Sequence, residues 1–500
     1  MKRIRVAGVL VAGNMLAGCA QFWPAPPTPV AAEDIAAQTR ADAEAVRRDV
    51  QPLAQTLTLD EAIARALKYN LDRRSRLMEE ALNARQFEAG KYDMLPRIVA
   101  QAGYFTRDSD RLAIAADVNG VPTGASPTVS QERTHYTTGL EFTWSLLDFG
   151  IARYTTQQTG DRVLAAAERR RKVTHQLVQD VSVAFWRAVS AQRLQADVKA
   201  NLVLAEEAMG DARKAEAERI RSPLDSLRFQ RQLTENMRLL EAIEQELATA
   251  RFELAGLINA PVVMNTTLVA QQEMPVGDLM SVPVEQLEEV ALAHNADLRE
   301  QMYNRRIAVT EAKKVIARAY PNISLDLGAK YDSDRYLVHH DWAEAGLQVS
   351  YNLLNLLALP AQKQAAEAGI ALADQRRLAM HVATVTQVHV AREQLIGARK
   401  QFQLADQLWV LDDRITKQMA SREQAQAGSK LERVAAQTTA IVSLLRRYQA
   451  LAQWHAAQSR MQATLGLDPL DRSTDDLTLG EVMEAVRLQM SRGLSLPAKQ

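Results

Sequence analysis

Four short stretches of the chain alternate apolar with polar residues, and this period of two predicts β-strands. They are the segments 97–106, 136–147, 322–331 and 344–354. In the third segment the apolar residues occupy every second position, at Ile323, Leu325, Leu327, Ala329 and Tyr331. Strands of about ten residues with one apolar face are typical of proteins that cross an outer membrane as strands. The alternative is four strands that lie on a soluble core.

Most of the remaining chain has the three-to-four-residue spacing of amphipathic helices. The spacing of a coiled-coil seam is found at Val181, Ala184, Ala188, Ala191, Gln195, Val198, Leu202, Ala205 and Met209. No proline interrupts 128–222 or 361–468. A helix from about 150 to 218 would be about 100 Å long at 1.5 Å per residue, which exceeds an ordinary globular domain. Shorter helices are predicted over 58–94 and 284–319, each ahead of a proline.

The two halves of the chain repeat this order of elements. Matched pairs are Asn70 with Asn295, Pro96 with Pro321, Gly139 with Gly346, and Ser222 with Ser429. The offset is 225 residues for the first two pairs and 207 for the last two. This change predicts an 18-residue difference between two surface loops, located between about 107 and 135 in the first half. The sequence therefore predicts repeats at 56–261 and 284–469, a linker at 262–283 and a C-terminal segment at 470–500.

The N-terminus predicts a signal peptide over residues 1–18, because a basic start precedes a short apolar run. The run ends in Leu16-Ala17-Gly18-Cys19, which resembles a bacterial lipobox and implies that Cys19 is acylated. An ordinary signal peptide with a chance cysteine is the alternative. Residues 19–55 are expected to hold the lipid anchor, a proline-rich spacer and a short helix. No later apolar run has the roughly 20 residues of a membrane helix, so any later crossing would use strands.

The composition excludes several classes of function. The 60 basic residues balance the 60 acidic ones, so charge gives no reason to expect a nucleic-acid partner. We find no phosphate-binding glycine loop, paired-cysteine metal site or nucleophile elbow, and therefore expect no enzyme and no cofactor besides the lipid. The pair His339-His340 with Asp341 lacks further ligands, so no metal site is predicted.

Each pair of long helices is predicted to turn at a matched point. The first turn reads Ser222-Pro223-Leu224-Asp225 and the second reads Gly428-Ser429-Lys430-Leu431-Glu432. A serine N-cap with an acid in the first helical turn explains both locally. That capping role does not exclude a second role.

Together, the lipobox, the two repeats and the matched asparagines and prolines resemble the TolC-like outer-membrane efflux factors, over roughly residues 56–470. The resemblance implies a mostly α fold with a small β part: a long α-helical coiled-coil barrel plus four transmembrane β-strands per chain. It implies a homotrimer that forms a 12-stranded β-barrel in outer-membrane lipid, with a large periplasmic extension. It also implies a periplasmic adaptor and an inner-membrane transporter as partners, and passive conduction of substrates to the outside.

The resemblance also assigns roles to the two turns, which would be the periplasmic tips that gate the channel and contact the adaptor. In the family an acid follows the turn, and Asp225 and Glu432 match it here. Three copies of Glu432 near an axis would favour cations. The chain departs from the family at Arg219 and Gln426, where a glycine is usual, and at Ala435, where a second acid is usual. The other candidate function is a lipid-anchored structural coiled coil without a pore, and the sequence specifies no substrate.

Overall fold

The computed structural model describes residues 28–114, 116–124, 126–218, 222–261, 266–270, 280–427, 429–470 and 476–492. The chain divides into two compact units, Met1–Pro52 and Leu53–Gln500. In the described part of the first unit, helix α2 (Ala32–Arg47) buries none of its residues. The remaining elements belong to the second unit.

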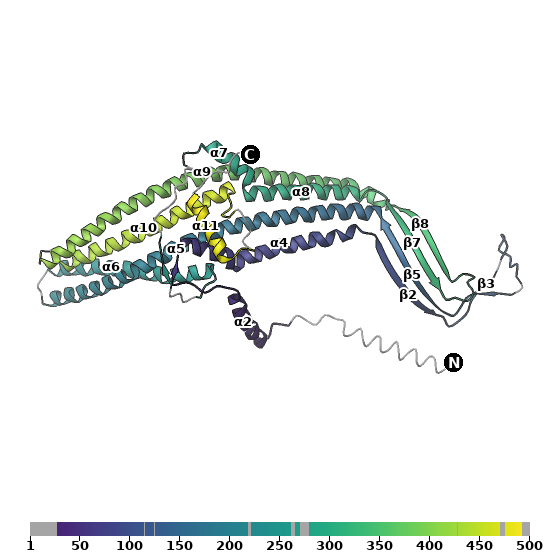
Figure 1. The fold of residues 1–500 in the computed structure, drawn as a ribbon, viewed down its shortest axis with the longest axis horizontal. Helices are drawn as coiled ribbons and strands as arrows, with labels where there is room; N and C mark the ends of the chain where they lie inside the picture. Colours follow the sequence, from purple (N-terminus) through teal and green to yellow (C-terminus); the bar gives the residue numbers. More distant parts are fainter. Residues whose placement is uncertain are drawn as a thin grey trace. The chain divides into compact units, whose positions relative to one another are not determined.

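A four-stranded antiparallel sheet lies at one end of the second unit, and two helical hairpins extend from it (Figure 1). The strands, in spatial order, are β2 (Arg97–Thr106), β5 (Thr134–Ser145), β7 (Asn322–Asp332) and β8 (Asp341–Ser350). The hairpins consist of α5 (Leu146–Ala217) with α6 (Pro223–Leu257) and of α9 (Leu354–Gln424) with α10 (Lys430–Leu465). The 72 residues of α5 give a helix about 108 Å long.

Two strands, β5 and β8, differ from the sequence prediction by more than one residue at their ends. The predicted strand 136–147 ends at Ser145, because its hydroxyl accepts a hydrogen bond from the Asp148 N–H at 3.0 Å and so caps α5. The predicted strand 344–354 lies earlier, at Asp341–Ser350, since its pairing with β7 ends at Asn322 opposite Ser350.

The loops at the end of the sheet away from the long helices explain why the offset between matched residues of the two repeats changes. The strand register leaves 27 residues between Thr106 and Thr134 but nine between Tyr331 and Asp341, a difference of 18. The longer loop contains its own hairpin, β3 (Arg111–Ala113) paired with β4 (Thr128–Gln131). The second repeat closes the same end with a short turn.

Each repeat opens with two helices, so the prediction of single helices over 58–94 and 284–319 was wrong. The pairs are α3 (Leu59–Tyr69) with α4 (Leu71–Gly90), and α7 (Val284–His294) with α8 (Ala296–Ala317). The break falls at the matched asparagines. The Asn70 Oδ1 accepts from the Arg73 N–H and its Nδ2 donates to the Leu257 carbonyl, both at 3.0 Å. Asn295 makes the same two bonds, to the Leu298 N–H and the Thr464 carbonyl.

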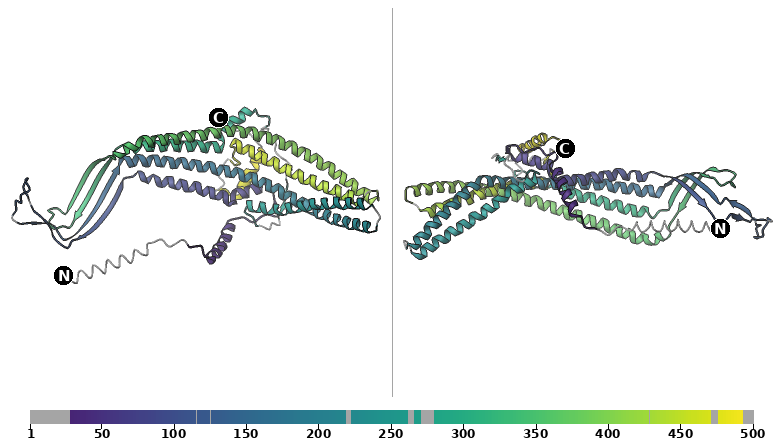
Figure 2. Two further views of the ribbon diagram at one scale, coloured as in Figure 1. Left: turned by 180° about the vertical axis from the view of Figure 1, so that it is seen from behind. Right: turned by 90° about the horizontal axis from the view of Figure 1, so that it is seen from below.

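The helices of the two hairpins pack side by side in the order α6, α5, α10, α9. Figure 2 shows α5 and α9 running from the sheet to the far end of the unit, while α6 and α10 return only part of the way. The coiled-coil seam predicted on α5 is buried at Val181, Ala188, Val198 and Ala205, but Gln195 is exposed and Leu194 is buried instead. Helix α5 packs against both α6 and α10, so its buried face is wider than the seam of a two-helix coiled coil and includes Leu194.

Smaller elements join the two repeats near the ends of the returning helices. Strand β1 (Thr56–Leu57) pairs in parallel with β6 (Thr267–Leu268). Helix α11 (Leu479–Arg492) packs on α3, and Arg487 forms an ion pair of 2.9 Å with Asp60. Within the described ranges, no helix is both long enough and apolar enough to cross a membrane.

A buried histidine on α10 should make stability depend on pH. The His455 ring stacks on Trp186 of α5 with centroids 5.2 Å apart, and burial lowers the pKa of its imidazole to about 4. The unfolded chain binds a proton here below pH of about 6.5, whereas the folded chain does not until about pH 4. The contribution of His455 to the free energy of unfolding is therefore fully present above about pH 6.5. The free energy of unfolding is expected to fall by about 3 kcal/mol as the pH drops towards 4.

The variant His455→Phe isolates this contribution, because other groups titrate equally in both proteins. Denaturant unfolding of the two proteins at a series of pH values should show the free energy of unfolding of the unmodified protein falling relative to that of the variant, by about 3 kcal/mol between pH 6.5 and pH 4. Parallel curves would show that His455 binds its proton equally in both states.

Candidate functional site: the hairpin tips and the exposed sheet

The second tip, between α9 and α10, is fixed by two backbone motifs. The Gln426 N–H donates to the Glu423 carbonyl at 2.9 Å and the Ala427 N–H donates to the Arg422 carbonyl at 2.8 Å, which is a Schellman motif. Gln426 has a φ of 57°, the left-handed conformation that favours glycine. The sequence therefore departs from the family's glycine at a position where the backbone still has a glycine's conformation.

A capping box starts α10 immediately after this turn. The Ser429 hydroxyl accepts from the Glu432 N–H at 3.3 Å, and the Ser429 N–H donates to Glu432 Oε2 at 3.1 Å. Both residues thus satisfy groups at the start of the helix that have no partner within it. The carboxylate of Glu432 is directed back to its own helix, and any role in a constriction would be additional to this one.

The first tip is built differently, and the expected serine cap is absent there. The Ser222 side chain makes no capping hydrogen bond, and Pro223 occupies the first position of α6. Proline needs no partner for a missing N–H and has the helical φ already, so the helix starts without the cap. Asp225 lies 3.8 Å from Arg228, and both side chains are exposed. Leu224 is 56% exposed.

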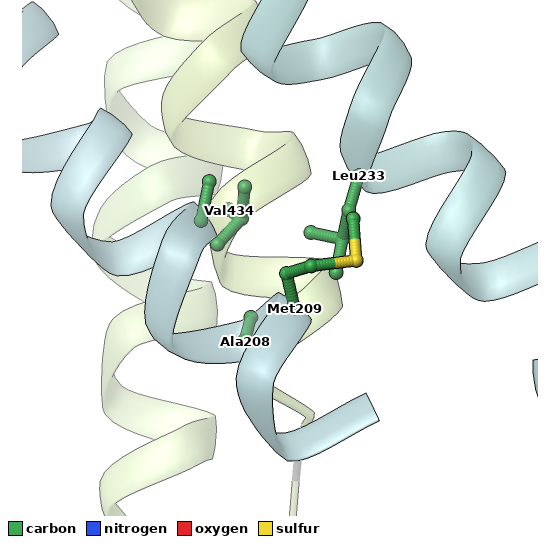
Figure 3. Close-up of a cluster of buried hydrophobic side chains, with 5 residues drawn as sticks. Ala208, Met209, Leu233 and Val434 are labelled. Carbon is green, nitrogen blue, oxygen red and sulfur yellow. The ribbon is translucent and has the colours of Figure 1, made fainter. Parts of the chain in front are cut away.

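The start of α10 is held against α5 near the tips. Lys430 Nζ lies 2.7 Å from Asp211 Oδ2 on α5, and this hydrogen bond holds the pKa of the Asp211 carboxyl below its ordinary value. Arg433 pairs with Glu423 of α9 at 2.8 Å. Below these pairs lies a hydrophobic cluster of Ala205, Ala208, Met209, Leu233 and Val434. Figure 3 shows the Met209 side chain extending towards Leu233.

The structure thus places seven of the predicted site residues at the starts of α6 and α10: Ser222, Pro223, Leu224, Asp225, Ser429, Leu431 and Glu432. Gly428 and Cys19 lie outside the described residues. Sequence reasoning missed the pair of Lys430 with Asp211, which are 219 residues apart. The positive φ of Gln426 could have been anticipated from the glycine that the family has there.

Replacing Gln426 with glycine should stabilise the second tip. Glycine removes the strain of the left-handed conformation, about 1–2 kcal/mol, but its freer unfolded chain offsets about 0.5–1 kcal/mol of that. We expect hydrogen exchange of the Ala427 amide to slow by about two- to fivefold. Gln424→Gly is the matched control: Gln424 is the last residue of α9, where glycine is unfavourable, so exchange should quicken. Faster exchange in Gln426→Gly would show that the turn does not store this strain.

The exposed sheet at the other end of the unit has one apolar face. The strand register aligns Ile98, Phe142, Leu327 and Ala345 in one row across all four strands. The next row contains Ala100, Leu140, Ala329 and Ala343, and a further one contains Trp144, Leu325 and Leu347. Most of these large side chains are exposed, with Leu140 at 52% and Leu347 at 73%. An exposed apolar face of this extent indicates contact with another apolar phase or partner.

The opposite face of the sheet carries charged and polar side chains. They include Arg97, Gln101, Glu141, Asp326, Lys330 and Glu344. Gln101 Nε2 donates to Glu141 Oε2 at 3.3 Å, and Lys330 pairs with Glu344. In the described chain β2 and β8 each pair on one side only, so both edges of the sheet present unpaired backbone groups.

Comparison with known proteins relates this arrangement to a family. No family model matches the chain. The probable efflux pump outer membrane protein SepC and the toluene efflux pump outer membrane protein TtgF, both from Pseudomonas putida, are each 29% identical to it over 282 residues. The match covers 54% of this chain and 53% of each relative, so the chain spans about half the length of these curated relatives.

Solved outer-membrane channels share the fold. The structure of OprN covers 82% of this chain and 89% of its own, with a TM-score of 0.63 and 15% identity. That of CmeC from Campylobacter jejuni covers 87% of this chain and 89% of its own, with a TM-score of 0.65 and 11% identity. The chain is similar to TolC-like outer-membrane efflux proteins, in sequence to SepC and TtgF and in fold to OprN and CmeC.

The predicted resemblance to TolC-like outer-membrane efflux proteins and the mostly helical fold with a small β part are thereby confirmed. The second tip has Gln426 where the resemblance predicts a glycine. The two tips also differ from each other, since the capping box closes one and a proline starts the other. Both tips lie at the ends of the long helices α5 and α9 that are farthest from the sheet.

Proposed function

We propose that the protein is the outer-membrane channel of a tripartite efflux or secretion system, which conducts substrates passively to the outside. The observation that carries the proposal is the four-stranded sheet with one exposed apolar face, one polar face and two unpaired edges. Lipid would cover the apolar face and water would fill the space at the polar face. Aromatic side chains near both ends of the apolar face, Tyr104 and Tyr136 at one and Trp144 at the other, fit the two membrane interfaces.

A homotrimer would satisfy the edges of the sheet. Pairing β8 of one copy with β2 of the next removes every edge after three copies, giving twelve strands in a closed barrel. Exposed apolar side chains also follow the two outer helices that continue from these edges, Met78 and Leu82 on α4 and Val382 and Leu404 on α9. A neighbouring copy would cover them in the same arrangement.

The proposal also implies partner proteins for this chain and a location in the outer membrane. SepC and TtgF are named as outer membrane proteins of efflux pumps, and by that likeness an inner-membrane transporter and a periplasmic adaptor would work with this chain. The hairpins would extend into the periplasm, with the tips at residues 222–225 and 428–432 contacting the adaptor and narrowing the channel. Acylation of Cys19 would anchor the mature chain in the outer membrane.

The deciding experiment measures the mass and the conductance of the full-length protein purified in detergent. We expect a trimer that gives discrete current steps in planar bilayers. A monomer that gives no steps, and that leaves the membrane without detergent once its acyl chains are removed, would instead establish a lipid-anchored coiled coil without a pore.

Glu432→Gln tests the gate in the same recordings. Glutamine accepts the capping hydrogen bond as glutamate does, so only the charge is lost. We expect the reversal potential in a salt gradient to show weaker cation selectivity, because three carboxylates leave the constriction. Asp225→Asn makes the same change at the first tip. Unchanged selectivity in Glu432→Gln would remove this residue from the gate.

A further inference from the structure

The two hairpins of the four-stranded sheet have the same register. The offset of 225 residues relates β2 to β7, and the offset of 207 residues relates β5 to β8. In the first hairpin Gly103 lies opposite Thr137, and in the second Gly328 lies opposite Glu344, which are the related positions. All 10 pairs of opposite residues in each hairpin correspond in this way. The two hairpins are therefore equivalent units, residue by residue.

The joint between these units inside the chain, where β5 pairs with β7, shows how a further unit fits beside the free edges. Leu140 of β5 lies opposite Ala329 of β7. The offsets relate Leu140 to Leu347 of β8 and Ala329 to Tyr104 of β2. The same joint between two copies therefore places Leu347 of one copy opposite Tyr104 of the next. Both side chains lie on the apolar face and are more than 70% exposed in one chain, at 73% and 72%.

The polar face agrees with this register. Thr137 lies opposite Asp332 inside the chain, and the offsets turn this pair into Glu344 of one copy opposite Arg107 of the next. Arg107 follows β2, and in the part of the chain that the structure describes it has no ion-pair partner. Opposite charges directly across a strand pair stabilise it. A shift by one residue would instead bring apolar residues of one strand to the polar face of the other.

The helices near the tips show the same relation. Ala208 of α5 and Val434 of α10 belong to one hydrophobic cluster, with Leu204 and Leu431 packed on it. The offset of 207 relates the first two to exposed side chains on the outer helices, Ile415 of α9 (48%) and Leu227 of α6 (54%). It relates the other two to further exposed leucines, Leu411 of α9 and Leu224 of α6.

We propose that neighbouring copies are joined in the register that joins the two repeats inside one chain. The joint consists of β8 paired with β2 of the next copy and of α9 packed on α6 of the next copy. Three pairs of residues meet across it: Leu347 with Tyr104, Glu344 with Arg107, and Ile415 with Leu227. The joint rests on the proposed channel, which needs a closed ring of copies. Equal joints around the ring also keep one strand tilt throughout the barrel.

Disulfide formation between copies tests the strand part. Thr143 lies opposite Asp326 inside the chain, so Ser350→Cys and Gln101→Cys should face each other between copies. Opposite residues of antiparallel strands have Cα atoms about 4.5–5.5 Å apart, which a disulfide spans. Within one chain the two positions are three strand spacings apart, about 14 Å. After mild oxidation of full-length protein in outer membranes, we expect a covalent trimer on a non-reducing gel.

Two control pairs shift the register by two residues in either direction, Gln348→Cys with Gln101→Cys and Gln348→Cys with Phe105→Cys. Their Cα atoms would be about 7–8 Å apart, so we expect at least about tenfold less covalent trimer. Cys19 is the only native cysteine, and Gln101→Cys alone gives its background. Stronger linkage of a control pair, or no linkage of any pair in a protein with the native mass of a trimer, would overturn the register and leave the channel standing. A monomeric native mass would reject both.

A short bismaleimide tests the helix part in the same membranes. Ile415→Cys with Leu227→Cys should give a covalent trimer, because α5 and α10 separate α6 from α9 within one chain, by about 24–30 Å at 8–10 Å per helix spacing. The control is Leu404→Cys with Leu227→Cys. Leu404 is also exposed on α9 but lies about three turns from Ile415, roughly 16 Å along the helix. Equal linkage of the two pairs would overturn the proposed contact between α9 and α6.

Discussion

Leu140→Arg is expected to abolish assembly of the protein into a membrane-inserted oligomer. Leu140 lies near the middle of β5, opposite Ala100 of β2 and Ala329 of β7, on the apolar face of the sheet. An arginine facing lipid at the membrane midplane costs about 2–4 kcal/mol, and three copies would cost about 6–12 kcal/mol. The yield of trimer in the outer-membrane fraction measures the effect.

Glu141→Arg is the matched control for this substitution. Glu141 is the next residue of the same strand but lies on the polar face, where its carboxylate accepts from Gln101. An arginine at this position stays in water, so the trimer should form at the yield of the unmodified protein. If Leu140→Arg assembled equally well, the apolar face would not contact lipid and the proposed orientation of the sheet would be wrong.

Gly466→Ala should destabilise the contact between the end of α10 and the junction of α7 with α8 by about 2–5 kcal/mol. Gly466 ends α10 with a φ of 68°, which costs an alanine about 1–2 kcal/mol. A Cβ there would lie 2.0 Å from the His294 carbonyl oxygen, so backbone must move and the packing cost is about 1–3 kcal/mol more. The shift would also strain the Asn295 bond to the Thr464 carbonyl. Denaturant unfolding of the purified protein measures the loss.

Gly210→Ala provides the contrast, because it lies inside α5 and an added Cβ meets nothing within 4 Å. Alanine there should stabilise by up to about 1 kcal/mol. A loss in Gly466→Ala no larger than about 1 kcal/mol would show that the α10 end can move away from His294 freely.

The two repeats illustrate how far the sequence alone reaches. The alternation that predicts strands and the spacing that predicts long helices depend on neighbouring residues, so a local pattern reveals them. The asparagine pair was visible as a match between the halves, but its effect was not. Asn70 breaks the opening helix because its amide reaches the Leu257 carbonyl, 187 residues away, and no local pattern contains that partner.

The tips show the same division. A serine followed by an acid predicts a cap at both turns, yet only Ser429 forms one, since Pro223 starts the other helix without it. The strict heptad placed Gln195 in the seam, whereas the observed helix buries Leu194, because α5 packs against more than one helix and its buried face is wider than a two-helix seam.

By itself the sequence determined the mostly helical fold and the apolar alternation of the strands, which follow from periodicity and internal repetition, and it gave the resemblance to TolC-like proteins. Only the tertiary structure decided that β5 pairs with β7 across the repeats and leaves β2 and β8 as edges. It alone brought Ala208 and Val434 into one cluster. Pairing across repeats and contacts between helices depend on segments hundreds of residues apart, and their positions are fixed only when the whole chain packs.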